Sequence, residues 1–224
     1  MLMVTEKIAT SLLDLAKVRA CVLDALEQQA TGCVTQSEPR SQFLKSDEHS
    51  NQYHVKGAYL TKDLVAGFRI REFSHIPAQS AEMQLLLLSD LETAAFLALV
   101  SCDKLSERRY GAMVALTIDA LRSSSATKLA VVGAGNLASA AVQAVQAACP
   151  FQTINVASRS GESRERFCKN MATIGVAGMV PCDSVEEACQ EADVILTITN
   201  AEAVLVHATW CAPGSLLVST GGRR

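Results

Sequence analysis

The stretch KLAVVGAGNLASAAVQAV, which runs from Lys128 to Val145, decides the fold of the second half of the chain. An apolar run is followed by the turn Gly133-Ala-Gly135-Asn-Leu-Ala138 and then by an alanine-rich segment, which is the order of strand, tight turn and helix. In this pattern the first glycine permits the turn, the second lets the backbone approach a pyrophosphate, and a small third residue lets the helix pack closely. The stretch therefore predicts a phosphate-binding turn, with a plain strand-to-helix connection as the alternative.

The residues of this turn are the first predicted cofactor contacts: Gly133, Gly135, Asn136 and Leu137. A helix that begins directly after such a turn points its free amides and the positive end of its dipole at a bound phosphate.

Strand and helix signals keep alternating after this turn. The predicted strands are 129–132, 153–159, 176–180, 193–200 and 214–222, and the predicted later helices are 162–172 and 184–192. Strands that are apolar on both faces belong to a parallel sheet covered on both sides. The predicted fold class is therefore α/β, a Rossmann-type doubly wound parallel sheet that we expect to be incomplete at its C-terminus.

The first half of the chain has a different texture. An amphipathic pattern predicts a helix over 11–29, a polar loop follows over 35–52, and period-two or apolar runs predict strands at 53–60, 65–73 and within 83–100, the last with a turn at Ser89-Asp90. A helix over 105–122 leads to a hinge at Ser123–Ser125. We therefore predict an α+β lobe with antiparallel strands over 1–122 and the nucleotide-binding lobe over 123–224.

Charge and cysteine usage narrow the function classes. The net charge is −3 with no block of like charges, which predicts neither nucleic acid nor an anionic membrane as a partner. The eight cysteines are scattered without a Cys-x-x-Cys pair, which favours reduced thiols in the cytoplasm. No apolar run is long enough to span a bilayer, and no metal site is predicted.

Ser158, Arg159 and Ser160 follow the second predicted strand of the nucleotide lobe, where a dinucleotide site meets the adenosine ribose. An acid there suits the 2′-hydroxyl of NAD, whereas an arginine with hydroxyl neighbours suits a 2′-phosphate. The sequence thus favours NADP(H) over NAD(H), with a solvated surface cation as the alternative.

Thr197 and Thr199 lie at the carboxyl end of the fourth strand, where ligands bind in open parallel sheets. We expect them near the cofactor, with Thr199 and Asn200 on the nicotinamide side. The alternative is that these β-branched residues are there for packing in the strand, especially Thr197.

Arginines from three segments of the first half are candidates for a carboxylate site: Arg40, Arg69 and Arg109. The guanidinium fork binds carboxylate bidentately, so three such groups suit an amino-acid or keto-acid substrate. Each of them alone is also an ordinary surface charge. Lys56 is a further candidate, His75 and His207 are expected to be structural, and the sequence assigns no catalytic residue.

The order and spacing of several motifs resemble the ornithine cyclodeaminase and mu-crystallin family. These motifs are SEPRSQF, YHVKGAYL, AGFRI, LLLLSDLETAAFLALVSCDKLSERRYGA, LAVVGAGNLA, NVASRS, EADVILTITNAEAVL and WCAPGSLLVSTGG, and they extend over almost the whole chain. The resemblance implies a homodimer with a substrate-binding and dimerisation lobe and a Rossmann lobe. It also implies an oxidoreductase or deaminase that moves a hydride at the α-carbon of a small amino or imino acid.

Carried onto this sequence, the resemblance implies that Arg40 and Arg109 hold the substrate carboxylate. Arg69 stands where most members have a lysine near the reacting carbon, and an arginine cannot serve as an acid-base group. The motif Arg109-Tyr110-Gly111-Ala112 replaces the usual Arg-Thr-Ala-Ala. The chain also ends before the segment that carries the family's catalytic aspartate, so we expect weak or absent turnover. The alternative function is a non-catalytic, mu-crystallin-like NADPH-binding protein or an inactive truncated paralogue.

Overall fold

A computed structural model of the chain describes residues 1–45, 52–73, 84–201 and 203–220. The chain divides into two compact units, Met1–Ser106 and Glu107–Arg224. This division precedes the predicted boundary after residue 122 because Val114, Ala115 and Ile118, on the last predicted helix of the first lobe, are buried in the core of the second unit.

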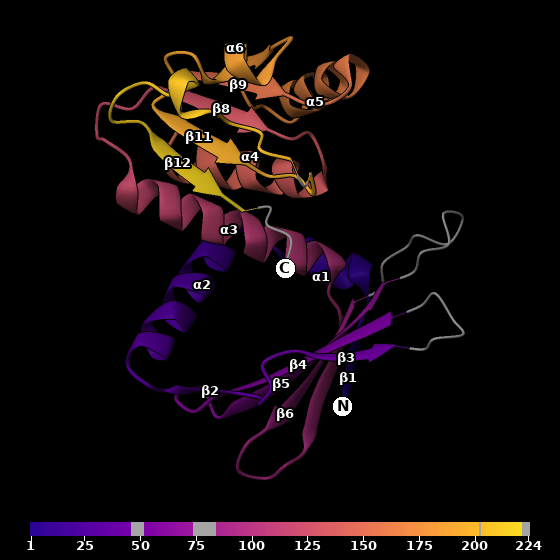
Figure 1. The fold of residues 1–224 in the computed structure, drawn as a ribbon. Coiled ribbons are helices and arrows are strands. Elements are labelled where there is room, and N and C mark those ends of the chain that lie inside the picture. The colour runs from indigo at the N-terminus through magenta and orange to yellow at the C-terminus, as the bar shows by residue number, and fades with distance from the viewer. Residues whose placement is uncertain (46–51, 74–83, 202, 221–224) are drawn as a thin grey trace. The chain divides into compact units, whose positions relative to one another are not determined.

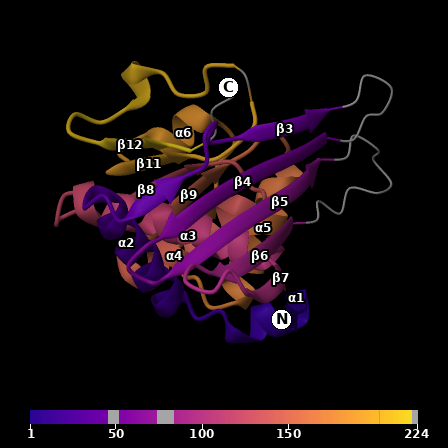
Figure 2. The ribbon, with the colours of Figure 1, turned by 90° about the horizontal axis from the view of Figure 1, so that it is seen from below.

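The first unit consists of two helices and a mixed sheet. The helices are α1 (Glu6–Leu12) and α2 (Leu15–Ala30), and the strands are β1 (Leu2–Val4), β2 (Val34–Gln36), β3 (Gln42–Lys45), β4 (Gln52–Leu60), β5 (Val65–Phe73), β6 (Gln84–Asp90) and β7 (Phe96–Ser101). The order is β1-β7-β6-β5-β4-β2, and β3 also pairs with β4. Figure 2 shows β3, β4, β5, β6 and β7 side by side in this succession. The antiparallel succession from β4 to β7 confirms the prediction, and β1 adds a parallel edge beside β7.

Three predicted boundaries in this unit are wrong. The helix predicted over 11–29 is two helices, because Asp14 adopts an extended conformation and its carboxylate accepts from the amide of Lys17, 2.9 Å away, which starts α2. The polar segment 35–52 contains β3, which pairs with β4. The turn before β7 follows Asp90 instead of including Ser89, because the Asp90 carboxylate accepts from the amides of Glu92 and Thr93.

The second unit is built on a parallel sheet. Its strands are β8 (Lys128–Val132), β9 (Thr153–Ala157), β10 (Met179–Pro181), β11 (Val194–Thr197) and β12 (Leu216–Ser219), in the order β10-β9-β8-β11-β12. Its helices are α3 (Asp103–Leu121, which begins in the first unit), α4 (Asn136–Ala148), α5 (Gly161–Thr173), α6 (Val185–Cys189) and the 3-10 turn η2 (Ala208–Trp210). All neighbouring strands of this sheet are parallel, which confirms the predicted doubly wound arrangement.

Helices cover this sheet on both faces (Figure 1). One core lies between the sheet and α3, α4 and α5, and a smaller one lies beneath α6 and η2. The chain moves from β8 to β9 and β10 on one side, and then returns to β11 on the other side of β8. The carboxyl ends of β8 and β11 therefore flank the point where the strand order reverses, which is where open α/β sheets bind ligands. Among the described residues, no helix has the length and apolar character needed to cross a bilayer.

Candidate functional site

Gly133 lies directly after β8 at the reversal of the strand order. Its φ of +129° belongs to a region that side-chain-bearing residues avoid, and a Cβ atom there would overlap the carbonyl oxygen of Ile198 after β11. Its amide donates to the carbonyl of Ala157 at the end of β9, at 2.8 Å. Gly133 thus joins the ends of three strands, and only glycine fits there.

The first turn of α4 presents its amides without a capping side chain. Gly135 occupies the N-cap position in an extended conformation, and the space that a Cβ atom would enter is open. Asn136 and Leu137 are exposed, Ala138 is buried against the sheet, and the first helical hydrogen bond runs from the amide of Ser139 to Gly135 at 3.0 Å. Free amides beside open space at a helix N-terminus fit a diphosphate.

The residues after β9 lie at the carboxyl end of the neighbouring strand. The Ser158 hydroxyl donates to the carbonyl of Ser160 at 2.8 Å, and the Ser160 hydroxyl accepts from the amide of Ser163 at 3.4 Å, which caps α5. The side chain of Arg159 is exposed and has no hydrogen bond or ion pair with any residue that the structure describes. Both serines thus make hydrogen bonds within this segment, and the Arg159 side chain is exposed beside them.

A hydroxyl cluster joins the carboxyl ends of β11 and β12. Thr197 is 8% exposed and lies within hydrogen-bonding distance of the Ser219 hydroxyl at 3.0 Å, while the carbonyl of Thr197 accepts from both the amide and the hydroxyl of Thr220 at 2.9 Å. The hydroxyl of Tyr110 on α3 donates to the carbonyl of Thr220 at 2.5 Å. The Thr197 hydroxyl therefore makes a hydrogen bond within the sheet, and its place near the cofactor stays a prediction. The sequence did not predict that Tyr110, Ser219 and Thr220 belong to this cluster. For Tyr110 alone there was a signal, because it departs from the threonine that usually follows Arg109 in the family.

Thr199 lies beyond the end of β11 and is half-buried. Its hydroxyl accepts from the amide of Ala201 at 3.2 Å, and the neighbouring Asn200 is exposed. Of the two predicted threonines, Thr199 is the one whose side chain remains accessible at this edge of the sheet.

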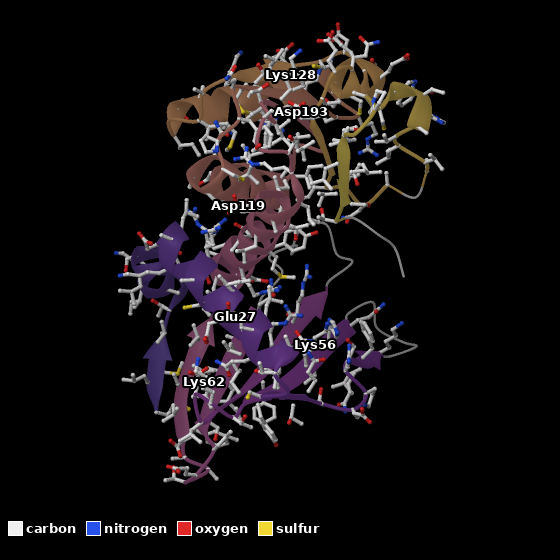
Figure 3. All side chains as sticks on the ribbon, turned by 90° about the vertical axis from the view of Figure 1, so that its left-hand side faces the viewer. Glu27, Lys56, Lys62, Asp119, Lys128 and Asp193 are labelled. Carbon is white, nitrogen blue, oxygen red and sulfur yellow. The ribbon has the colours of Figure 1, made fainter. Side chains whose placement is uncertain are left out.

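A pocket of about 380 Å³ lies on one face of the sheet in the first unit. It is lined by Gln36, Arg40, Lys56, Gly57, Ala58, Gly67, Arg69 and Leu86. Lys56 of β4 lies directly opposite Arg69 of β5, which in turn lies opposite Leu86 of β6, so the three side chains leave the sheet on the same face. Lys56 is labelled in Figure 3.

Arg40 reaches this pocket from a break in the edge of the sheet. The strands β2 and β3 pair with opposite halves of β4, and the segment between them passes Gly57, whose carbonyl accepts from the amide of Ser37 at 2.9 Å. The structure thus brings Arg40 and Arg69 together and adds Lys56. Arg109 lies instead in the second unit, where its guanidinium is exposed and 3.2 Å from the Sδ atom of Met113.

A larger hollow of about 830 Å³ lies elsewhere in the second unit. Lys128 and Thr153, at the amino ends of β8 and β9, line it together with residues of α6 and η2. It is therefore at the opposite end of the strands from Gly133 and the predicted phosphate-binding turn. Nearby, burial raises the pKa of the Cys189 thiol to about 11, so this cysteine is not a ready nucleophile.

The remaining candidates for chemistry are the histidines and possible metal ligands. His207 packs edge-on against Trp210, with ring centroids 4.4 Å apart, and His75 lies outside the described residues. Within the ranges that the structure describes, no three His, Cys, Asp or Glu side chains are grouped to hold a metal ion.

These features find their counterpart in known proteins. The model of the ornithine cyclodeaminase/mu-crystallin family matches residues 1–224. The chain belongs to this family.

Curated relatives of this chain are similar to it over only part of their own length. Ketimine reductase mu-crystallin of Mus musculus is 27% identical over 166 residues, which are 74% of this chain and 50% of the relative. The NAD(P)H-dependent anabolic L-arginine dehydrogenase of Pseudomonas aeruginosa is 32% identical over 120 residues, 54% of this chain and 37% of the relative. The chain thus spans about half the length, or less, of these curated relatives.

A solved structure confirms the fold expected for the ornithine cyclodeaminase/mu-crystallin family. The structure of Thermococcus litoralis Δ1-pyrroline-2-carboxylate reductase in complex with NADH and L-proline superposes with a TM-score of 0.90. It is 19% identical and covers 99% of this chain and 69% of its own, which shows a shared fold.

One departure from the usual motif of the ornithine cyclodeaminase/mu-crystallin family has a structural explanation. A Cβ atom at Gly111 of α3 would overlap the carbonyl oxygen of Ala140 in α4, so the glycine allows the two helix backbones to approach closely. The neighbouring Tyr110 connects α3 to β12. The altered pair thus fits how α3 packs on this sheet.

Proposed function

We propose that this chain binds a nicotinamide dinucleotide and belongs to an oxidoreductase or deaminase that acts at the α-carbon of a small amino or imino acid. The observation that carries the proposal is the turn at Gly133, where a left-handed glycine and the uncapped amides of α4 meet at the reversal of the strand order. Membership of the ornithine cyclodeaminase/mu-crystallin family and the names of the relatives support it.

The chain's own residues divide the binding between two sites. The amides of Asn136 and Leu137 at the start of α4 hold the diphosphate, and Arg159 holds a 2′-phosphate, which favours NADP(H) over NAD(H). Arg40 and Arg69 hold the carboxylate of the amino or imino acid. When bound, the nicotinamide supplies or accepts the hydride.

We also infer that two copies associate through the first unit. Tyr59, Phe68 and Ile70 lie on the face of the sheet opposite Lys56 and Arg69, and these large side chains are 43%, 37% and 43% exposed. A patch of aromatic and aliphatic side chains on a sheet face suits a second copy of the same face.

A nucleotide-binding protein without catalysis is the second candidate. Arg69 favours it, because a guanidinium stays protonated in proteins and cannot exchange a proton with the substrate. All eight cysteines are free thiols, which suits a reducing compartment such as the cytoplasm for either candidate.

Nucleotide titration followed by a turnover assay tests the proposal. The fluorescence of NADPH and NADH is measured as the chain is added, and nicotinamide absorbance is then followed with pyrroline-2-carboxylate, ornithine or alanine. We expect NADPH to bind and any turnover by this chain to be weak, so an absorbance change with at least one substrate supports the oxidoreductase or deaminase. Binding without any change supports the second candidate, and failure of both nucleotides to bind contradicts both.

A further inference from the structure

Arg164 is a second arginine beside the loop that carries Arg159. It lies on α5 one turn after Ser160, whose carbonyl accepts from the Arg164 amide at 3.2 Å. Long side chains on a helix point back toward its N-terminus, and the Arg164 guanidinium does so. Its Nη2, Cζ and Nη1 atoms lie 3.6, 3.7 and 4.0 Å from the place that a Cβ atom would occupy at Gly161, the first residue of α5. The guanidinium therefore lies against the first turn of α5, next to the loop after β9.

The carboxylate of Asp183 binds this guanidinium. It accepts from Nη2 of Arg164, and this is the one ion pair that Arg164 makes within the part of the chain that the structure describes. Asp183 follows β10, where Pro181 pairs with Val156 of β9, so it lies at the same carboxyl edge of the sheet as the loop after β9. The Arg164 side chain is 14% exposed and the Asp183 side chain is 92% exposed. The ion pair thus connects the start of α5 to the segment after β10, with its carboxylate toward solvent.

A solvated carboxylate is a replaceable partner for an arginine. Ion pairs at the surface stabilise proteins little, because water hydrates both charges and the long side chain loses freedom. A phosphate carries more negative charge than a carboxylate and accepts from a guanidinium through several oxygens. The Nε and Nη1 donors of Arg164 have no partner among the described residues. A phosphate beside Arg159 is therefore able to replace Asp183 as the partner of Arg164.

We propose that Arg164 is a second cation of the 2′-phosphate site and that Asp183 is an internal competitor that limits the preference for NADP(H). This inference rests on the proposed function and adds the regulation of its cofactor site. In the free chain the Asp183 carboxylate occupies the guanidinium. A bound 2′-phosphate takes its place between Arg159 and Arg164, and the displaced carboxylate is hydrated. NAD(H) has a hydroxyl at this position, so it leaves the ion pair intact.

Two ligands that differ only in the 2′-phosphate test the proposal by binding alone. Adenosine 2′,5′-bisphosphate and adenosine 5′-monophosphate share the adenine, the ribose and the 5′-phosphate. Their affinities for the whole chain are measured by calorimetry or by ligand-observed NMR. We expect the unmodified chain to prefer the bisphosphate, and added salt to reduce this preference.

Two substitutions with opposite expected effects locate the competition. Arg164→Gln should weaken bisphosphate binding about fivefold or more, because a charged donor is lost. Asp183→Asn should strengthen it about threefold or more, because the competing charge is removed while the side chain keeps its size. Neither variant should change the affinity for the monophosphate by more than about twofold. If Arg164→Gln does not fold, the sign of the Asp183→Asn effect decides.

Two further variants are matched controls. Arg166→Gln removes an arginine from an exposed ion pair with Glu162 on the same helix. Glu191→Gln removes a carboxylate from an exposed ion pair with Lys128, which begins β8 at the other end of the strands. Both should leave the ratio of the two affinities unchanged. Circular dichroism and thermal unfolding check that all four variants fold.

Several outcomes overturn the inference. Weaker bisphosphate binding by Asp183→Asn means that Asp183 positions Arg164 instead of competing for it, and an Arg164→Gln variant that behaves like Arg166→Gln removes Arg164 from the site. An unmodified chain that does not prefer the bisphosphate also contradicts it. If NADPH binds but the variants leave the ratio unchanged, only this inference is wrong. If bisphosphate binding changes as expected but NADPH does not bind, the proposed function fails and this inference stands.

Discussion

Gly133 and Gly135 lie in the same turn, but the absence of a side chain has a different consequence at each position. Gly133 is required by the fold, because its backbone is left-handed and the carbonyl of Ile198 fills the place of a Cβ atom. Gly135 has an ordinary φ of −92° and open space around the missing Cβ, so the fold does not require it. The open space is on the side where a diphosphate is expected.

The variants Gly133→Ala and Gly135→Ala should therefore separate stability from binding. We expect Gly133→Ala to lower the free energy of unfolding by about 3 kcal/mol or more, through strain and overlap. Gly135→Ala should cost no more than about 1 kcal/mol, since alanine is a poor N-cap, yet weaken NADPH binding. Urea unfolding and fluorescence titration measure the two effects, and equal stability of the two variants would contradict the assignment.

Arg159 determines the predicted cofactor preference. Replacing it with alanine should weaken NADPH binding about tenfold or more, because a charge-assisted hydrogen bond to the 2′-phosphate is lost, and should leave NADH binding almost unchanged. Arg166→Ala, on the exposed face of α5, is the control and should affect neither nucleotide. Tighter binding of NADH than NADPH by the unmodified chain would remove this role from Arg159.

Among the elements, α3 and α4 meet at a point where there is no room for a side chain. Gly111 faces the carbonyl of Ala140 there. The Arg108 guanidinium donates to the Gln143 side-chain oxygen at 3.2 Å, which adds a polar contact between the same helices. The close approach lets α3 bury Val114 and Ile118 in the core of the second unit.

Gly111→Ala should force these helices apart. We expect the overpacking to lower the free energy of unfolding by about 1–3 kcal/mol, even though alanine favours a helix over glycine by about 1 kcal/mol. Gly161→Ala in α5 is the matched control, because its Cβ atom would meet the Arg164 side chain at an ordinary 3.6 Å, and it should be neutral or slightly stabilising. Thermal unfolding of both variants is measured. If Gly111→Ala is as stable as Gly161→Ala, the close approach of α3 and α4 does not require a glycine.

Asp193 ties the beginning of β8 to β11. Its carboxylate accepts from the amides of Thr127 and Lys128 at 2.7 and 2.8 Å (Asp193 and Lys128 are labelled in Figure 3). The hydrogen bonds from Lys128 and then Thr127 hold the pKa of Asp193 below its ordinary value of 3.8. Because the pKa is lowered on folding, the stabilisation is complete well above pH 3.8 and is lost as the pH falls from there through the lowered pKa.

Asp193→Ala should cost about 2 kcal/mol at neutral pH, because two amides lose a charged acceptor. The difference from the unmodified chain should shrink in acid below about pH 3.8. Glu191→Gln, at an exposed ion pair with Lys128, should change stability little and serves as the control. Urea unfolding as a function of pH measures the stability of both variants. If the stability difference between Asp193→Ala and the unmodified chain is the same in acid as at neutral pH, the negative charge on Asp193 is not its cause.

At the scale of the whole molecule, the exposed face of the first sheet predicts self-association. Ile70→Asp should convert a dimer into monomers, because it places a charge in the centre of an apolar interface. Leu12→Asp, at a 71% exposed position on α1, is the control and should leave the mass unchanged. Light scattering coupled to size exclusion gives the mass, and a monomeric unmodified chain would contradict the proposed dimer.

Local patterns in the sequence were enough to predict the second unit's sheet. Glycine spacing, apolar runs and helix periodicity repeat over short distances, so the turn at Gly133 and the succession of β8, α4 and β9 could be predicted, with strand ends that differ by one or two residues from the structure. The first unit was harder. The strand β3 has only two adjacent apolar residues, Phe43 and Leu44, within a polar segment, and it is formed by pairing with β4. The short strand β1 owes its place to pairing with β7.

By itself, the sequence determined the α/β class, the glycine turn and the set of cations available for a carboxylate. Only the tertiary structure decided which of them share a pocket: Arg40, Lys56 and Arg69 do, and Arg109 belongs to the other unit. It also placed the Thr197 hydroxyl within hydrogen-bonding distance of the Ser219 hydroxyl on β12. The physical reason is that turn chemistry and periodicity act between near neighbours, whereas strand register and side-chain convergence depend on pairing between segments far apart in the chain.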